Sequence, residues 1–86
     1  MKTTLKDGFE VEVIDESLND WELLEMLNAI DEGDSGNVVK VARLLLGKPE
    51  YERLKNHYRV DGRVSANGMI TAIGELLESI GELKNS

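Results

Sequence analysis

The strongest constraint on the fold is an apolar stripe near the carboxyl end of the chain. Met69, Ile73, Leu76, Ile80 and Leu83 are separated by alternating steps of four and three residues. This spacing places all five side chains on one face of a helix. Two heptads are too few for an independent coiled coil. The stripe therefore predicts a helix packed into a core, with a docking face for another chain's helix as the alternative.

The chain has 86 residues, which suits one small domain, and we expect residues 1–86 to form a single unit. It contains no cysteine, which excludes both a disulfide framework and a thiolate metal site. No apolar run approaches the roughly 20 residues of a membrane span, and the first residues lack a signal-peptide pattern. These features favour a soluble cytoplasmic protein without a membrane partner.

The net charge of −7 is unevenly distributed along the chain. Residues 1–39 carry two basic and eleven acidic side chains, whereas residues 40–63 carry seven basic and three acidic ones. The basic middle is compatible with nucleic acid, but the acidic amino-terminal half of so small a protein would repel phosphates. The two oppositely charged segments are better explained by charge pairing within the chain or by head-to-tail stacking of subunits. We therefore expect self-association and no nucleic-acid partner.

The amino-terminal segment 1–14 is typical of a β-hairpin. A three-residue loop over 6–8, with Gly8 in the left-handed conformation, pairs Thr3 with Val11 and gathers the apolar side chains on one face. A two-residue loop would scatter them over both faces. Because an isolated hairpin is barely stable in water, this face must lie on the helices or extend a neighbour's sheet.

About four helices are expected after the hairpin, which makes the fold class α+β and mainly helical. Gly47 and Pro49 separate the second helix from the third, and Ser65 caps the last one. Ser35 is the expected cap of the second helix. The predicted ranges are 20–32, 36–46, 49–59 and 66–83.

The first helix has the clearest start signals. Asn19 is the expected N-cap, with Glu22 as its reciprocal partner, and Gly33 is the expected end. The predicted buried face consists of Leu23, Leu24, Leu27 and Ile30, with Trp21 and Met26 on its flanks.

The middle of the chain supplies further apolar groups. The segment 38–46 is apolar nearly all round and is therefore expected to be central, and Tyr51, Leu54 and Tyr58 form one helical stripe. The segment 60–64 indicates a turn with short extended flanks. Three glycines interrupt the last helix and indicate either close backbone contacts or a soft helix, namely Gly68, Gly74 and Gly81.

No pattern in the chain predicts catalysis, a cofactor or a metal ion. His57 is the only imidazole and lacks a recognisable nucleophile or orienting carboxylate, so a surface or packed histidine is favoured. The acidic loop beginning at Asp31 fails the calcium pattern, because Gly33 and Ala42 stand where ligands are required. We therefore expect neither an enzyme nor a binder of small-molecule substrates.

Two other classes of protein match weakly. An acyl carrier protein would attach phosphopantetheine to Ser35 in Asp34-Ser35, but Gly36 replaces the usual leucine. A helix-turn-helix DNA binder would place its turn at 47–49, and the basic middle segment supports it, but the net charge of −7 argues against it.

Several segments taken in order resemble the short tail assembly chaperones of long-tailed bacteriophages and prophages of Gram-positive hosts. The resemblance runs over nearly the whole chain and rests on the order and spacing of its segments. They are DGFE at 7–10, NDWELL at 19–24, LLLGKPEYERL at 44–54, DGRV at 61–64 and KNS at 84–86.

The resemblance implies a non-enzymatic assembly factor of the host cytoplasm that is absent from the finished virion. Its partners would be the tape measure protein and the tail-tube protein. Such chaperones are commonly made in two lengths by a −1 ribosomal frameshift, and Lys84-Asn85 can be encoded by a slippery AAA-AAC, with an ordinary polar tail as the alternative. The runner-up is a small interaction or regulatory module of a mobile element.

The candidate partner-binding residues come from the two stripes of the carboxyl-terminal half. The same side chains are also the best candidates for the core. They are Met69, Ile73, Leu76, Ile80, Tyr51, Leu54 and Tyr58.

Overall fold

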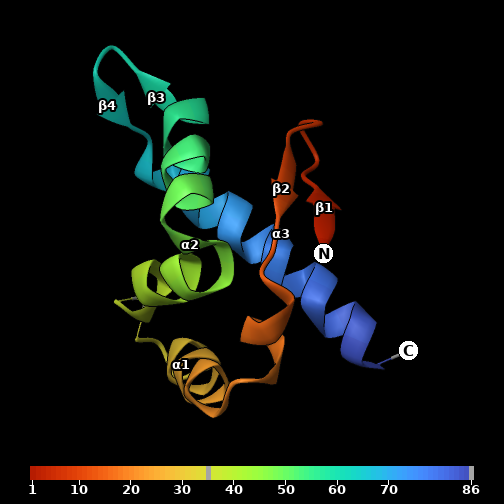
Figure 1. Cartoon of the computed structure of the whole chain (residues 1–86). Coiled ribbons are helices and arrows are strands. Elements are labelled where there is room, and N and C mark those ends of the chain that lie inside the picture. Colours follow the sequence, from red (N-terminus) through yellow and green to blue (C-terminus); the bar gives the residue numbers. More distant parts are fainter. Residues whose placement is uncertain (35, 86) are drawn as a thin grey trace.

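The computed structural model describes residues 1–34 and 36–85, with side chains as far as residue 81. Figure 1 shows a mainly helical α+β protein with an amino-terminal β-hairpin, which confirms the predicted class. The elements in order are β1 (Lys2–Thr4), β2 (Glu10–Glu12), the 3-10 helix η1 (Asp15–Asn19), α1 (Trp21–Asp31), α2 (Asn37–His57), β3 (Arg59–Val60), β4 (Arg63–Val64) and α3 (Ala66–Asn85).

The number of helices differs from the prediction of about four. The described residues contain three α-helices, because the segments predicted at 36–46 and 49–59 are the two halves of α2. Within α2 only Gly47 leaves the helical conformation, with φ 74° and ψ 167°. Pro49 lies just beyond it, where a proline at the start of a helical turn is tolerated. The two halves therefore meet at a kink, which is visible in Figure 1.

The kink leaves the carbonyl of Leu45 in α2 without its usual helical partner. Pro49 has no N–H to offer the carbonyl of Leu45, which instead accepts a hydrogen bond of 2.8 Å from the amide of Ile14. The carbonyl of Leu44 accepts a bond of 2.6 Å from the buried hydroxyl of Ser17. The segment that leads into α1 therefore binds the break in α2 and satisfies its backbone.

The first hairpin has the predicted register. Thr3 pairs with Val11, and the amide of Leu5 donates a 2.9 Å bond to the carbonyl of Phe9 across the three-residue loop. Gly8 has φ 94°, as that loop requires. The apolar face lies on the helices, since Leu5 and Val11 belong to the same buried cluster as residues of α2 and α3.

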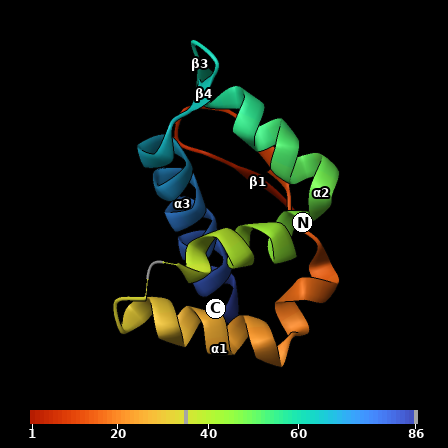
Figure 2. The ribbon, with the colours of Figure 1, turned by 90° about the vertical axis from the view of Figure 1, so that its left-hand side faces the viewer.

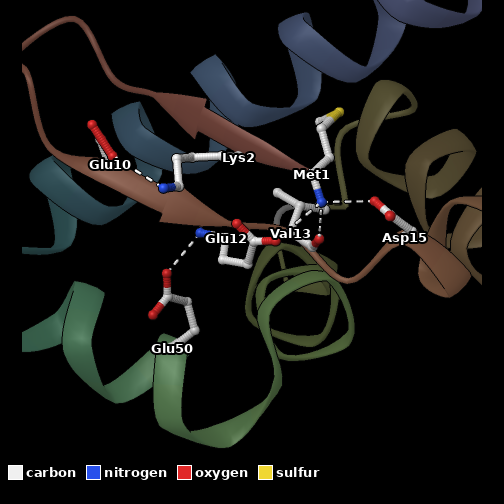
Figure 3. A network of polar contacts seen from close by, with 7 residues as sticks. All are labelled: Met1, Lys2, Glu10, Glu12, Val13, Asp15 and Glu50. Atoms are coloured by element: carbon white, nitrogen blue, oxygen red, sulfur yellow. Dashed lines mark hydrogen bonds and ion pairs between the residues drawn. The ribbon is translucent and has the colours of Figure 1, made fainter.

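Side chains from α2 cover the outer edge of β2. The Glu50 carboxylate accepts a 2.6 Å bond from the amide of Glu12 (Figure 3). Both terminal nitrogens of Arg53 donate 2.9 Å bonds to the carbonyl of Glu10. On the same hairpin the Met1 amino group donates to the carbonyl of Val13 at 2.7 Å. The edge of β2 is thus occupied within the chain rather than offered to a neighbouring sheet.

The start of α1 corrects one prediction. The N-cap is Asp20, not Asn19, because Asn19 already belongs to η1. Asp20 has the extended backbone that a cap needs, and its Oδ1 accepts the amides of Glu22 at 2.8 Å and Leu23 at 3.3 Å.

The orientation of α1 corrects a second prediction. Leu23 is fully buried, as expected, whereas Leu27 and Ile30 are only half-buried. Leu24, predicted to be buried, is 42% exposed, and Trp21, predicted as a core flank, is 74% exposed. Two consecutive leucines point about 100° apart on a helix, so burial of Leu23 turns Leu24 toward solvent.

The carboxyl-terminal part of the chain follows the sequence more closely. Residues 61 and 62 form the turn between β3 and β4, both with positive φ. Ser65 caps α3, because its Oγ accepts the amide of Gly68 at 3.0 Å. Of the predicted stripe, Ile73, Leu76 and Ile80 are buried and Met69 is half-buried, whereas the side chain of Leu83 lies outside the described residues.

The core is one cluster to which the hairpin, α1, both halves of α2 and α3 contribute. Its buried apolar members are Leu5, Val11, Val13, Leu23, Val41, Ala42, Leu45, Leu46, Leu54, Ala72, Ile73, Leu76 and Ile80. Within the described part of the chain, none of the helices has the length and apolar character needed to cross a membrane.

Candidate binding groove between α2 and α3

An open apolar groove separates the beginning of α3 from both halves of α2. Figure 2 shows α3 running from the β3–β4 hairpin toward α1, past the beginning of α2. The groove has a volume of about 360 Å³. Its lining consists of Val38, Val39, Ala42, Tyr51, Lys55, Val64, Ala66, Met69, Ile70 and Ile73.

The groove has an apolar floor and an apolar rim. Ala42 and Ile73 form the floor and are almost fully buried. Val39 and Ile70 stand on the rim with exposed fractions of 46% and 56%. Aliphatic side chains exposed together at the rim of an apolar hollow mark a candidate interaction site. The arrangement suits an apolar ligand surface rather than a polar small molecule.

One edge of the groove carries positive charge around Tyr51. The Arg43 guanidinium lies 5.7 Å from the centre of the Tyr51 ring, and the Lys55 ammonium lies 5.4 Å from it. Lys55 also pairs with Glu52 at 3.3 Å. Lys48 joins these residues around a second hollow that shares Tyr51 and Lys55 with the groove. This edge favours acidic groups on whatever the groove binds.

The groove contains only part of the predicted set of partner-binding residues. Tyr51, Met69 and Ile73 line it. Leu54, Leu76 and Ile80 are not among the residues that line the groove and are at most 3% exposed, so they belong to the core.

The last member of the set, Tyr58, lies elsewhere. Its ring packs against Gly68, and its hydroxyl donates a 3.2 Å bond to Asp7. Tyr58 is therefore a contact between the end of α2, the first hairpin and α3 rather than part of the groove.

Sequence reasoning missed the two rim residues. Val39 was expected in the centre of the core because its segment is apolar nearly all round, and the structure shows it half in solvent. Ile70 lies beside Met69, off the stripe of α3, and is exposed. An aliphatic residue next to a complete stripe was the available signal, because the stripe alone satisfies the core.

His57 lies in a polar contact that joins the first hairpin to α2. Its Nε2 is 2.9 Å from Oδ2 of Asp7, and its ring stacks on Phe9 with a centroid distance of 3.9 Å. The hydrogen bond from His57 lowers the pKa of Asp7, and the Phe9 amide and the Tyr58 hydroxyl add to the effect. Partial burial, followed by the Asp7 charge, raises the pKa of Tyr58. The arrangement holds two distant segments together.

No group of three or more His, Asp or Glu side chains is placed to hold a metal ion within the described residues. Ser35, the candidate phosphopantetheine site and helix cap, lies outside the described residues. The segment 47–49 lacks the turn of a helix-turn-helix motif, since Gly47 alone departs from helical geometry.

Comparisons of the chain with protein-family profiles, with curated proteins and with solved structures found no match. The fold and the groove define a small, mainly helical protein with an open apolar surface.

Proposed function

We propose that this protein is a non-catalytic tail assembly chaperone of a long-tailed phage or prophage of Gram-positive bacteria. In this role it binds an apolar helix of the tape measure protein in the groove between α2 and α3. The resemblance in sequence supports the assignment, and the observation that carries it is the exposure of Val39 and Ile70 beside the apolar floor.

Binding would follow the helix-in-groove mode. The apolar face of a client helix covers Val39, Ile70 and Met69, and the floor provides an apolar surface beneath it. Covering a half-exposed aliphatic side chain contributes on the order of 1 kcal/mol. A few such contacts give weak, reversible binding. Weak contacts suit a chaperone that occupies a long client at many positions and is displaced when tail-tube subunits polymerise.

The charged edge of the groove adds selectivity. Arg43, Lys48 and Lys55 favour client helices that carry Asp or Glu beside their apolar stripe. The contact requires no cofactor and no nucleic acid. We place the protein in the host cytoplasm and not in the mature virion, because its groove would be released once the tail tube covers the client.

The test is co-expression with the large, apolar, helix-rich protein encoded immediately downstream. We expect the solubility of that protein to depend on this chain, and Ile70→Glu or Val39→Glu to abolish the effect by placing a charge in the groove. Val60→Glu is the matched control, because Val60 is 67% exposed and does not line the groove. Circular dichroism of each variant checks that it is folded.

Two outcomes would contradict the proposal. If the downstream protein is soluble alone and does not bind, the tail-chaperone assignment is wrong, and an interaction module of a mobile element becomes the better description. If it binds equally well to the Ile70→Glu and Val60→Glu variants, the groove is not the binding site.

A further inference from the structure

The outer face of α1 is a second exposed apolar surface. Trp21 and Leu24 lie one helical turn apart and are 74% and 42% exposed. Leu23 is fully buried on the opposite side, so α1 cannot rotate to hide them without losing a core contact. A tryptophan held in water in this way, beside an aliphatic residue, is an uncommon arrangement for a surface without a partner.

The charge carried by α1 itself is negative, although Lys40 of α2 shares a hollow with Glu22 and Glu25. Between Trp21 and Asp31 the helix has three acidic side chains and no basic one. Glu22, Glu25 and Asp31 are all exposed, and Glu25 lies next to Trp21 on the outer face. A partner that covers Trp21 must therefore place its own charged groups against carboxylates.

This surface is separate from the groove and opposite to it in charge. The residues described as lining the groove include none from α1. Figure 2 shows α1 at the end of the molecule opposite to the β3–β4 hairpin, beside which the groove begins. The groove has a basic edge, whereas the α1 face is acidic. The two surfaces therefore favour ligands of different charge.

We propose that the outer face of α1 binds an amphipathic protein helix in which Lys or Arg residues flank an apolar stripe. Trp21 and Leu24 pack against the stripe, and a basic residue pairs with Glu25, which lies one helical turn from Trp21. A cation can also lie on the indole face. The contact is small, so binding is reversible. With a second ligand in the groove, the protein joins two partners of opposite charge. This inference does not rest on the identity of the groove's client.

The test uses Trp21, the only tryptophan of the chain, as its reporter. The probes are two synthetic helical peptides of equal length, one of Leu and Lys and one of Leu and Glu. With the Leu/Lys peptide we expect a saturable blue shift of the Trp21 emission and a binding heat, both weakened by salt. The Leu/Glu peptide should give neither.

Variants of the full chain identify the surface. Glu25→Lys should weaken binding of the Leu/Lys peptide by about tenfold or more, because an attraction becomes a repulsion. Glu78→Lys makes the same change of net charge on an exposed residue of α3 and should leave affinity unchanged. Ile70→Glu, which blocks the groove, should also bind the peptide normally.

Four results would overturn the inference. The first is equal binding of both peptides, and the second is an equal loss of affinity for the Leu/Lys peptide in Glu25→Lys and Glu78→Lys. The third is loss of Leu/Lys peptide binding in Ile70→Glu. The fourth is a blue shift of the Trp21 emission that grows with protein concentration in the absence of peptide. The third places the peptide in the groove, and the fourth shows that a second copy covers Trp21. Because the groove variants keep the α1 face intact, failure here is distinguishable from failure of the client assay.

Discussion

At the level of single residues, two glycines of α3 have opposite surroundings. A Cβ atom on Gly68 would lie 2.6 Å from Cδ1 of Tyr58, whereas a Cβ on Gly74 would meet nothing within 4 Å. Alanine at Gly74 should stabilise the protein by about 0.5–1 kcal/mol, because it favours the helix without a clash. Alanine at Gly68 should destabilise it, since the aromatic ring must move. Urea unfolding followed at 222 nm measures both changes.

The Tyr58 ring provides the control for this pair. In a Tyr58→Ala background the clash is absent, so Gly68→Ala should no longer be destabilising, and the difference between the two backgrounds measures the contact. If Gly68→Ala stabilises the chain while Tyr58 is present, the ring is free to move aside and Gly68 is not a close packing point.

Some features of single residues could be predicted from the sequence, and others could not. Ser65 and the buried part of the α3 stripe were predictable, because a cap and a periodic face depend on neighbours within one helix. The cap of α1 was not. Asn19 and Asp20 are both good caps, and the choice depends on η1, which Ser17 anchors to α2 across the fold. Local patterns could not decide between them.

At the level of elements, the kink in α2 depends on the segment before α1. Ser17→Ala removes the 2.6 Å bond to the carbonyl of Leu44 and leaves that partly buried acceptor without the hydroxyl. Loss of such a bond costs about 1–2 kcal/mol. Asn19→Ala, at an exposed position of the same η1, is the control and should change stability little. Chemical unfolding of the two variants makes the comparison.

Equal stability of the Ser17→Ala and Asn19→Ala variants would show that another group bonds the Leu44 carbonyl at the kink.

The kink itself was only partly predictable from the sequence. Gly47 and Pro49 gave the correct position of the break. They also predicted that a helix resumes at Pro49, but not that Ile14 and Ser17, far away in the chain, supply the donors at the break.

At the level of the whole molecule, the groove has no local signature. Its lining comes from three stretches, within 38–42, 51–55 and 64–73, which only the packing of α2 against α3 brings together. The sequence identified the apolar stripes but could not say which members remain exposed. The predicted stripe residues Leu54, Leu76 and Ile80 belong to the core cluster. Val39 and Ile70 stand exposed on the rim of the groove. Periodicity therefore identifies core residues as readily as residues that bind a partner.

The contact of Asp7 with His57 and Tyr58 joins the amino-terminal hairpin to the end of α2, about fifty residues away in the chain. These contacts lower the pKa of Asp7 below its ordinary value of 3.8, with the His57 hydrogen bond as the largest cause. The unfolded chain therefore binds a proton at Asp7 more readily than the folded one. The resulting stabilisation is fully present above about pH 5 and is lost as the pH falls through 3.8 and then through the lower folded pKa.

Asp7→Asn should remove this dependence on pH while keeping an acceptor for the Phe9 amide. We expect wild type to exceed Asp7→Asn in stability at pH 6 and the difference to shrink steadily toward pH 3, as measured by urea unfolding. His57→Ala removes the principal cause of the lowered Asp7 pKa. In the His57→Ala background, the change in stability made by Asp7→Asn should therefore depend less on pH. A gap between wild type and Asp7→Asn that stays constant from pH 6 to pH 3 would show that Asp7 acts only as an uncharged turn residue. The junction between the hairpin and α2 would then not depend on the Asp7 charge.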